Sequence, residues 1–116
     1  MKTISKASTW AKLLYEFLGT AVMTYSYNAS LDKSTANVRS RPFAFFLMWI
    51  IAFKVSGAHF NPATSFAVFQ AERKMSNLLG FGMTFLAQVC GAYLGIALSY
   101  LLIKDYLENY YLLFDA

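Results

Sequence analysis

The sequence is poor in the residues from which disulfide, metal and catalytic sites are built. It contains one cysteine and one histidine, so we expect neither a disulfide framework nor a Cys/His metal site. It shows no nucleophile–base pair and no phosphate-binding glycine loop, so we expect no enzymatic activity and no bound cofactor. The net charge of +4 is small and scattered, which argues against a nucleic-acid partner.

Charge of either sign is scarce as well. Charged residues make up 14% of the chain and hydrophobic residues 58%, whereas soluble domains average about 25% and roughly 45–50%. The mean hydropathy is +0.43. A chain of 116 residues allows one small domain at most. We therefore expect an all-α integral membrane protein whose surroundings are the lipid bilayer.

Three apolar runs predict membrane-spanning helices. The runs at 13–31 and 78–103 are long enough to cross about 30 Å of hydrocarbon. The run at 42–55 has only 14 residues, or about 21 Å of helix, so it spans only if the helix starts before Pro42 or the bilayer is thinned. Pro42 fits a first helical turn. With their polar flanks, the helices are expected at about 10–31, 39–55 and 76–103.

The segment Ser56–Ala63, which reads Ser-Gly-Ala-His-Phe-Asn-Pro-Ala, predicts a helix that begins inside the membrane. Asn61 can cap a helix whose first turn admits Pro62. The helix expected over 62–71 is too short to span. Such half-helices occur at membrane depth only where they line a cavity or are buried in protein, and their positive end then faces the cavity.

The C-terminal residues 104–116 form a separate predicted unit after the membrane part at 1–103. Apolar side chains recur at helical spacing at positions 103, 106, 107, 110, 111 and 114, and three of them are tyrosines. This pattern predicts an amphipathic helix in the membrane interface or against a partner.

The N-terminal dozen residues carry Lys2, Lys6 and Lys12 and no acid. One interpretation is a positive flank that keeps this end on the inner side of the membrane. The other is an organelle-targeting leader, against which the absence of arginine counts. With the N-terminus and the loop after the half-helix inside, six cations lie inside and four outside, which favours that orientation weakly and leaves dual insertion open.

Three motifs in order resemble the aquaporin and glycerol-channel family, the major intrinsic proteins. Ser56–Ala63 resembles the first signature loop of that family, the NPA motif, with its Asn-Pro-Ala tripeptide. Tyr15–Thr20 resembles the first-helix motif Ala-Glu-Phe-Leu-Gly-Thr, and Ala87–Ala92 resembles the third-helix motif. The resemblance covers residues 10–103 and implies one repeat: three transmembrane helices and one re-entrant half-helix. Family members carry two inverted repeats, and only the first is found here.

The resemblance assigns roles to several residues. It implies that Glu16 holds the re-entrant loop by hydrogen bonds to its backbone, and Gln88 is expected to bond to the same loop. The carbonyls of Gly57, Ala58 and His59 would form one side of a water path. Asn61 would present its amide to solute or merely cap the half-helix, and both interpretations stay open. Pro62 and Ala63 are the remaining residues expected in this pore-like re-entrant loop.

Two further features bear on function. Counting back from Asn61 places Arg41 at the family's selectivity-filter position on the second helix, which argues against an ordinary water filter.

On the third helix, small residues recur every four positions and let helices approach closely. We expect them to pack against a partner repeat from another chain. The helix-packing set is Gly19, Ala87, Gly91, Gly95 and Ser99.

Two functions from different classes remain. In the first, the chain is a structural or accessory subunit of a larger membrane protein complex, partnered by other transmembrane subunits, and does not conduct by itself. In the alternative, it is half of a channel for water or a small neutral solute, completed by a second repeat or an antiparallel dimer. The basic N-terminus would fit a mitochondrial inner membrane.

Overall fold

The computed structural model describes residues 8–29 and 35–114, with the side chains of 8–29 and 39–104. Residues 1–7 of the predicted basic leader and the predicted end of the first helix at residue 31 lie outside the described residues, whereas Lys12 lies in the first helix. The helices are α1 (Thr9–Ala29), α2 (Thr35–Ser56), α3 (Pro62–Glu72), the short 3-10 helix η1 (Met75–Asn77) and α4 (Leu78–Phe114). Within the described ranges there is no strand, so the fold is all-α.

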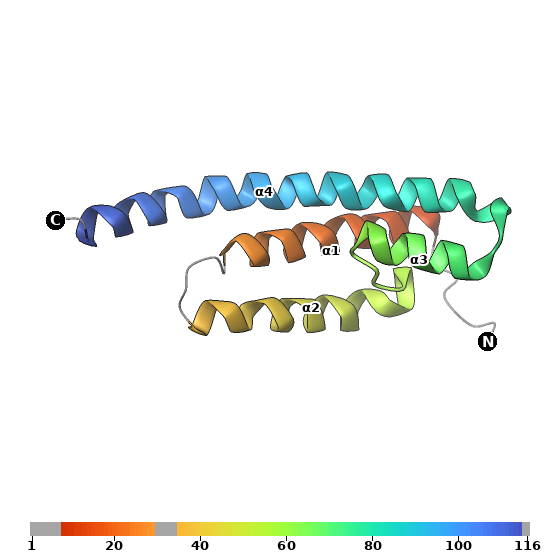
Figure 1. Cartoon of the computed structure of the whole chain (residues 1–116), viewed down its shortest axis with the longest axis horizontal. Coiled ribbons are helices and arrows are strands. Elements are labelled where there is room, and N and C mark those ends of the chain that lie inside the picture. Colours follow the sequence, from red (N-terminus) through yellow and green to blue (C-terminus); the bar gives the residue numbers. More distant parts are fainter. Residues whose placement is uncertain (1–7, 30–34, 115–116) are drawn as a thin grey trace.

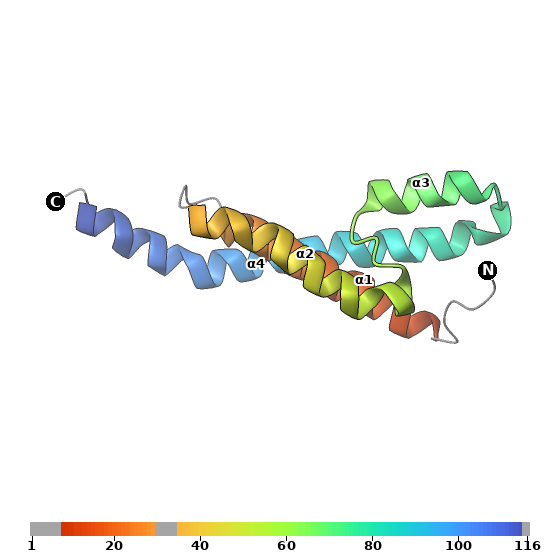
Figure 2. The same ribbon diagram turned by 90° about the horizontal axis from the view of Figure 1, so that it is seen from below.

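The long helices α1, α2 and α4 run alternately up and down along one axis (Figure 1). Helix α1 lies in the middle and packs against both α2 and α4, while α3 packs against α4. Seen from below, α3 stands to the side of the α1–α2 pair and is joined to α2 by a loop without helical structure (Figure 2). This arrangement places the loop between α2 and α3 beside the middle helix.

Helix α2 begins earlier than the expected boundary at 39. It starts at Thr35 and its 22 residues make about 33 Å of helix, enough to cross the hydrocarbon. Pro42 consequently lies inside α2 and not in its first turn, which corrects the sequence interpretation. At this position proline lacks the N–H that would bond to the carbonyl four residues earlier, and its ring crowds that carbonyl, so Pro42 weakens α2 locally.

Helix α4 continues without a break past residue 103 to Phe114. Its 37 residues measure about 55 Å, well beyond the roughly 30 Å of hydrocarbon. Figure 1 shows its last turns projecting past the ends of α1 and α2. The predicted tail therefore continues α4 and is not separated from it by a break. Its placement in the membrane interface stays a prediction.

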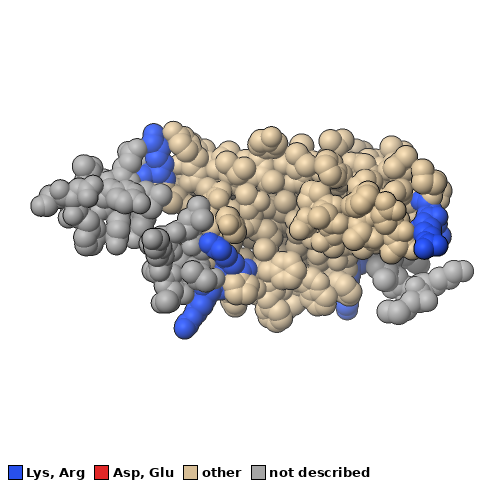
Figure 3. All heavy atoms as spheres, viewed as in Figure 1, with Lys and Arg blue, Asp and Glu red and all other residues tan. Residues whose placement is uncertain are grey.

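The described interior includes several polar side chains, and many large apolar side chains lie on the exterior. The largest fully buried side chains are Glu16 and Gln88, whereas large hydrophobic residues such as Leu79 and Leu101 are exposed. On the face drawn in Figure 3, Lys and Arg lie toward the two ends of the molecule, with an uncharged surface between them. This distribution suits a chain whose sides face hydrocarbon and whose buried polar groups bond to one another.

One helix of the described part is long and apolar enough to cross a membrane by length and composition alone, namely Met75–Lys104. Helix α1 does not meet that criterion, since it carries Glu16 together with several tyrosines and hydroxyl side chains. Helix α2 has three cations, Arg39, Arg41 and Lys54, near its ends. The three predicted spans thus differ in apolar character, with α4 the clearest.

Candidate functional site

The loop between α2 and α3 has an unusual backbone. Gly57, Ala58 and Phe60 have positive φ angles of 91°, 53° and 51°. Glycine adopts such angles easily, but alanine and phenylalanine do so at a cost of about 1–3 kcal/mol each and only where the surroundings hold them. The loop therefore depends on contacts from other elements.

Glu16 on α1 supplies the main contact. Its Oε1 accepts a hydrogen bond of 3.1 Å from the backbone N–H of His59, and its Oε2 accepts one of 2.8 Å from the N–H of Phe60. The side chain is 2% exposed. Charge-assisted bonds of this kind are about twice as strong as neutral ones. The carboxylate thus clamps the strained loop, in the role that the sequence resemblance assigned to it.

Gln88 on α4 joins the same cluster. Its Nε2 donates to Oε2 of Glu16 and to Oγ of Ser65, both at 2.9 Å. Its Oε1 is buried and has no hydrogen-bond partner among the described residues. The carboxylate can only accept, so the amide must turn its donors toward it. Gln88 therefore binds the loop through Glu16 and Ser65 rather than through the loop backbone.

Ser65, in the first turns of α3, completes the cluster. Its Oγ lies 3.0 Å from Nδ1 of His59 in addition to accepting from Gln88. The cluster links α1, the loop, α3 and α4. Sequence reasoning did not assign Ser65 to the cluster; the signal available was a serine four residues after the helix cap Asn61, one turn into α3.

The clamp also fixes where the loop carbonyls point. Each peptide unit in the described chain is trans, so a carbonyl points opposite to the N–H of the next residue. Because the N–H groups of His59 and Phe60 point at Glu16, the carbonyls of Ala58 and His59 point away from it. The N–H of Ala58 donates to Oγ of Ser56 at 3.1 Å. The loop thereby presents acceptors on the side opposite Glu16.

Asn61 caps α3 as its sequence suggests. Its Oδ1 accepts from the backbone N–H of Ala63 at 2.9 Å, and Pro62 occupies the first helical position. Helix α3 ends at Glu72, one residue beyond the expected half-helix, with Arg73 in the left-handed conformation. Asn61 is exposed and also lines the cavity described below, so capping and a cavity-facing amide coexist.

The small residues allow close packing inside the chain. A side chain at Gly91 would collide with the backbone carbonyl of Phe17, and one at Gly95 would meet α1 at Ala21 and Thr24. Ser99 accepts a bond of 3.2 Å from Asn28. The stripe on α4 therefore packs against α1 of the same chain, not against a repeat from another chain as expected. Ala87 is half-buried in the same stripe.

Gly19 has a different neighbour. A Cβ at this position would overlap the ring of Phe60, which is 5% exposed and rests on α1 at this point. The absence of a side chain on Gly19 thus makes room for Phe60, the third residue of the loop with a positive φ angle. Phe60 was not predicted as a site residue.

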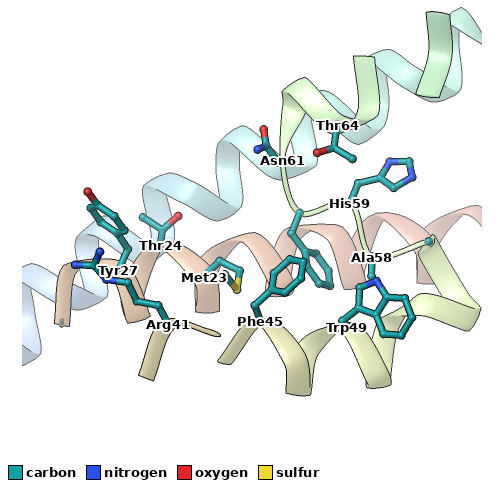
Figure 4. Close-up of a pocket in the computed structure, with 12 residues that line it drawn as sticks. Met23, Thr24, Tyr27, Arg41, Phe45, Trp49, Ala58, His59, Asn61 and Thr64 are labelled. Carbon is teal, nitrogen blue, oxygen red and sulfur yellow. The ribbon is translucent and has the colours of Figure 1, made fainter. Parts of the chain in front are cut away.

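A partly open cavity of about 610 Å³ lies between the loop, α1 and α2. The predicted residues Gly57, Ala58, His59 and Asn61 line it, whereas Pro62 and Ala63 do not. Figure 4 shows Asn61 and Thr64 at the start of α3, with Met23 and Thr24 of α1 and Phe45 and Trp49 of α2. Sequence reasoning did not name Met23, Thr24, Phe45 or Trp49. The loop thus forms one wall of a real cavity.

Arg41 and Tyr27 lie at the far end of this cavity from the loop (Figure 4). The Arg41 guanidinium sits 4.2 Å from the centre of the Tyr27 ring. The position counted back from Asn61 in the sequence is therefore a cavity position. His59 also borders a second cavity of about 470 Å³ between α1, α3 and the start of α4.

The polar groups that line the cavity are loop backbone groups, the Asn61 amide, the hydroxyls of Thr24, Tyr27 and Thr64, the His59 imidazole and the Arg41 guanidinium. The Glu16 carboxylate lies behind the loop. Among the described residues, no three His, Cys, Asp or Glu side chains lie close enough together to hold a metal ion. The arrangement can hydrogen-bond small solutes or another polypeptide.

Comparison with known proteins gives one match. The family model described as "Major intrinsic protein" matches residues 3–113. No curated protein and no solved structure matches the chain.

Proposed function

The chain belongs to the major intrinsic protein family, whose members are membrane channels and not enzymes, and we propose a function from this premise. The chain is a structural subunit of a larger membrane assembly and does not conduct by itself. Membership makes it an integral membrane protein. The observation that carries the proposal is the partly open cavity beside the clamped loop. A partner over its open side would bury the loop.

The physical argument rests on what lipid can cover. Hydrocarbon offers no hydrogen bonds, so non-helical backbone at membrane depth must be buried in protein or line a water-filled cavity. The loop at 57–61 has carbonyls turned away from Glu16 and an exposed Asn61. Another polypeptide over the cavity would bury these groups. The projecting end of α4 offers a second place of contact outside the hydrocarbon.

A second candidate function is half of a channel for water or a small neutral solute. The observation in its favour is the intact clamp, which holds a row of carbonyls and the Asn61 amide along one cavity. Against it stands Arg41 at the far end of the same cavity. A complementary half or an antiparallel second copy would then close the opening.

Photo-cross-linking tests the proposal with a matched pair. Phe45 lines the cavity, whereas its neighbour Phe46 does not, and they are 42% and 58% exposed. We expect p-benzoyl-phenylalanine at position 45 to cross-link a different protein in native membranes and at position 46 to cross-link lipid. Lipid adducts alone at both positions would contradict the proposal. A product of twice the mass of the 13.1 kDa chain would favour the antiparallel copy instead.

The prediction of a mitochondrial inner membrane rests on the basic N-terminal residues alone and stays a prediction. A fluorescent fusion at the C-terminus, imaged against organelle markers, tests it. The proposal of a structural subunit holds for any membrane in which the partner is present.

A further inference from the structure

The second cavity, of about 470 Å³, lies at one end of the molecule. Its walls come from the start of α1, from α3 down to its last residue, from η1 and from the start of α4. Figure 1 shows that α1 begins, α3 ends and α4 begins at this same end. The apolar stretch Met75–Lys104 also starts here, so in a membrane-spanning chain this end lies at the level of the lipid headgroups.

Two side chains of opposite charge line this cavity. Lys12 lies near the start of α1 and Glu72 is the last residue of α3, and both are exposed. Oε2 of Glu72 accepts a hydrogen bond of 2.8 Å from Nδ2 of Asn77, which holds the carboxylate toward η1. Apart from the imidazole of His59, no other ionisable side chain of the described residues lines the cavity. The cavity therefore offers one group for an anion and one for a cation.

Much of the remaining wall is apolar and reaches the outside of the molecule. The rings of Phe69 and Phe81 stack with their centroids 5.0 Å apart. Val68 and Leu79 line the same cavity and are 37% and 76% exposed. A hydrocarbon chain can therefore lie against these side chains while it extends into the bilayer, and the apolar surface that it buries stabilises it there.

We propose that this cavity binds the headgroup of one phospholipid whose amine is a primary ammonium, as in phosphatidylethanolamine. Lys12 pairs with the phosphate, Glu72 accepts hydrogen bonds from the ammonium, and the apolar wall holds part of an acyl chain. A primary ammonium has three N–H donors for a carboxylate, whereas the quaternary ammonium of phosphatidylcholine has none. The volume lies within the range of about 300–1,000 Å³ that is typical of ligand pockets.

This inference goes beyond the proposed function. It concerns a lipid site in a cavity other than the one that a partner would cover, and it holds whether or not that partner is bound. The two also fail separately, because lipid binding is measured on the chain alone and cross-linking at Phe45 is measured in native membranes.

Native mass spectrometry of the purified full chain in detergent tests the headgroup preference. Dioleoyl phosphatidylethanolamine, phosphatidylcholine and phosphatidylglycerol carry the same acyl chains and differ only in the headgroup. We expect the ethanolamine lipid to bind about fivefold more tightly than the choline lipid, which is what a solvent-accessible ion pair contributes at most. Glu72→Gln should remove this preference, because the ammonium then has no carboxylate to pair with.

A matched pair of lysine variants tests the phosphate contact. Lys12→Gln should weaken the binding of both zwitterionic lipids by about fivefold. Lys54→Gln is the control, since Lys54 is an exposed lysine in the last turn of α2 that does not line the cavity. It should leave both affinities unchanged. Circular dichroism shows whether each variant keeps its helical content.

Four results would overturn the proposal. In the first, the parental chain binds phosphatidylcholine or phosphatidylglycerol as tightly as phosphatidylethanolamine. In the second, the ethanolamine preference survives in Glu72→Gln, and in the third, Lys54→Gln weakens binding as much as Lys12→Gln. In the fourth, free O-phosphoethanolamine competes at the same concentration as the lipid, because the site would then bind a soluble solute and the acyl chain would contribute nothing.

Discussion

Gln88 on α4 donates a hydrogen bond of 2.9 Å to the carboxylate of Glu16 on α1, and both side chains are almost completely buried. Neither residue contacts lipid in this arrangement. Through this pair, the two helices hold a loop whose backbone angles would otherwise be unfavourable. The loop then shapes one wall of the cavity. The Glu16–Gln88 pair thus connects α1, α4 and the loop.

Replacing the clamp should destabilise the fold. Glu16→Gln keeps the size of the side chain but puts an amide donor among three donors, the N–H groups of His59 and Phe60 and Nε2 of Gln88. We expect the free energy of unfolding to fall by about 2–4 kcal/mol, measured by SDS titration in micelles. Glu72→Gln, at an exposed carboxylate, is the matched control and should not change it measurably. Equal effects would contradict the clamp.

Two glycines on α4 should respond in opposite directions. Gly91→Ala forces a methyl group against the carbonyl of Phe17, and we expect a loss of about 1–3 kcal/mol in unfolding free energy. Gly82 has no atom within 4 Å of an added Cβ, so Gly82→Ala should stabilise the helix by about 0.5–1 kcal/mol. If Gly91→Ala is tolerated as well as Gly82→Ala, α1 and α4 do not pack as described.

The cap of α3 can be tested apart from the cavity. Asn61→Ala removes the acceptor for the N–H of Ala63 and should cost about 1 kcal/mol. Asn61→Asp keeps an acceptor at the helix N-terminus and should cost little. Hydrogen exchange in the first turn of α3 reports the difference. Faster exchange in both variants would show that the side chain does more than cap the helix.

The single cysteine tests the placement of α4 in the membrane. Cys90 is exposed near the middle of the apolar stretch Met75–Lys104. In nanodiscs, both faces of which are open to water, we expect a water-soluble maleimide to leave it unmodified, because a polar reagent does not enter the hydrocarbon. The control is a Cys90→Ala, Ser76→Cys variant, whose cysteine lies at the end of the stretch and should react readily. Equal reaction rates would contradict a membrane-spanning α4.

Much of the loop was predictable because its chemistry is local. The sequence Asn61-Pro62 indicates both the cap and the start of α3, and the motif around Glu16 indicates the clamp by resemblance. The acceptor role of Ser65 and the position of Phe60 over Gly19 depend on how three elements meet. The spacing of residues along the sequence does not reveal such tertiary contacts. They became visible only in the structure.

The partner of the small-residue stripe shows the same limit. The four-residue spacing of Gly91 and Gly95 predicts a close helix contact, but the pattern is the same for α1 or for a helix of another chain.

Helix bounds were uncertain where local signals conflict. Pro42 is typical of a first turn, yet α2 continues seven residues before it. Periodicity is helical on both sides of residue 103, so it could not show whether the third predicted helix ends there.

Water permeability of the purified chain tests the central claim most directly. Stopped-flow light scattering compares empty liposomes with liposomes that contain the parental chain or Asn61→Asp. If the chain is a structural subunit that does not conduct by itself, all three permeabilities are equal. Permeability above that of empty liposomes, lost in Asn61→Asp, would contradict the account and favour a half channel completed by a second copy.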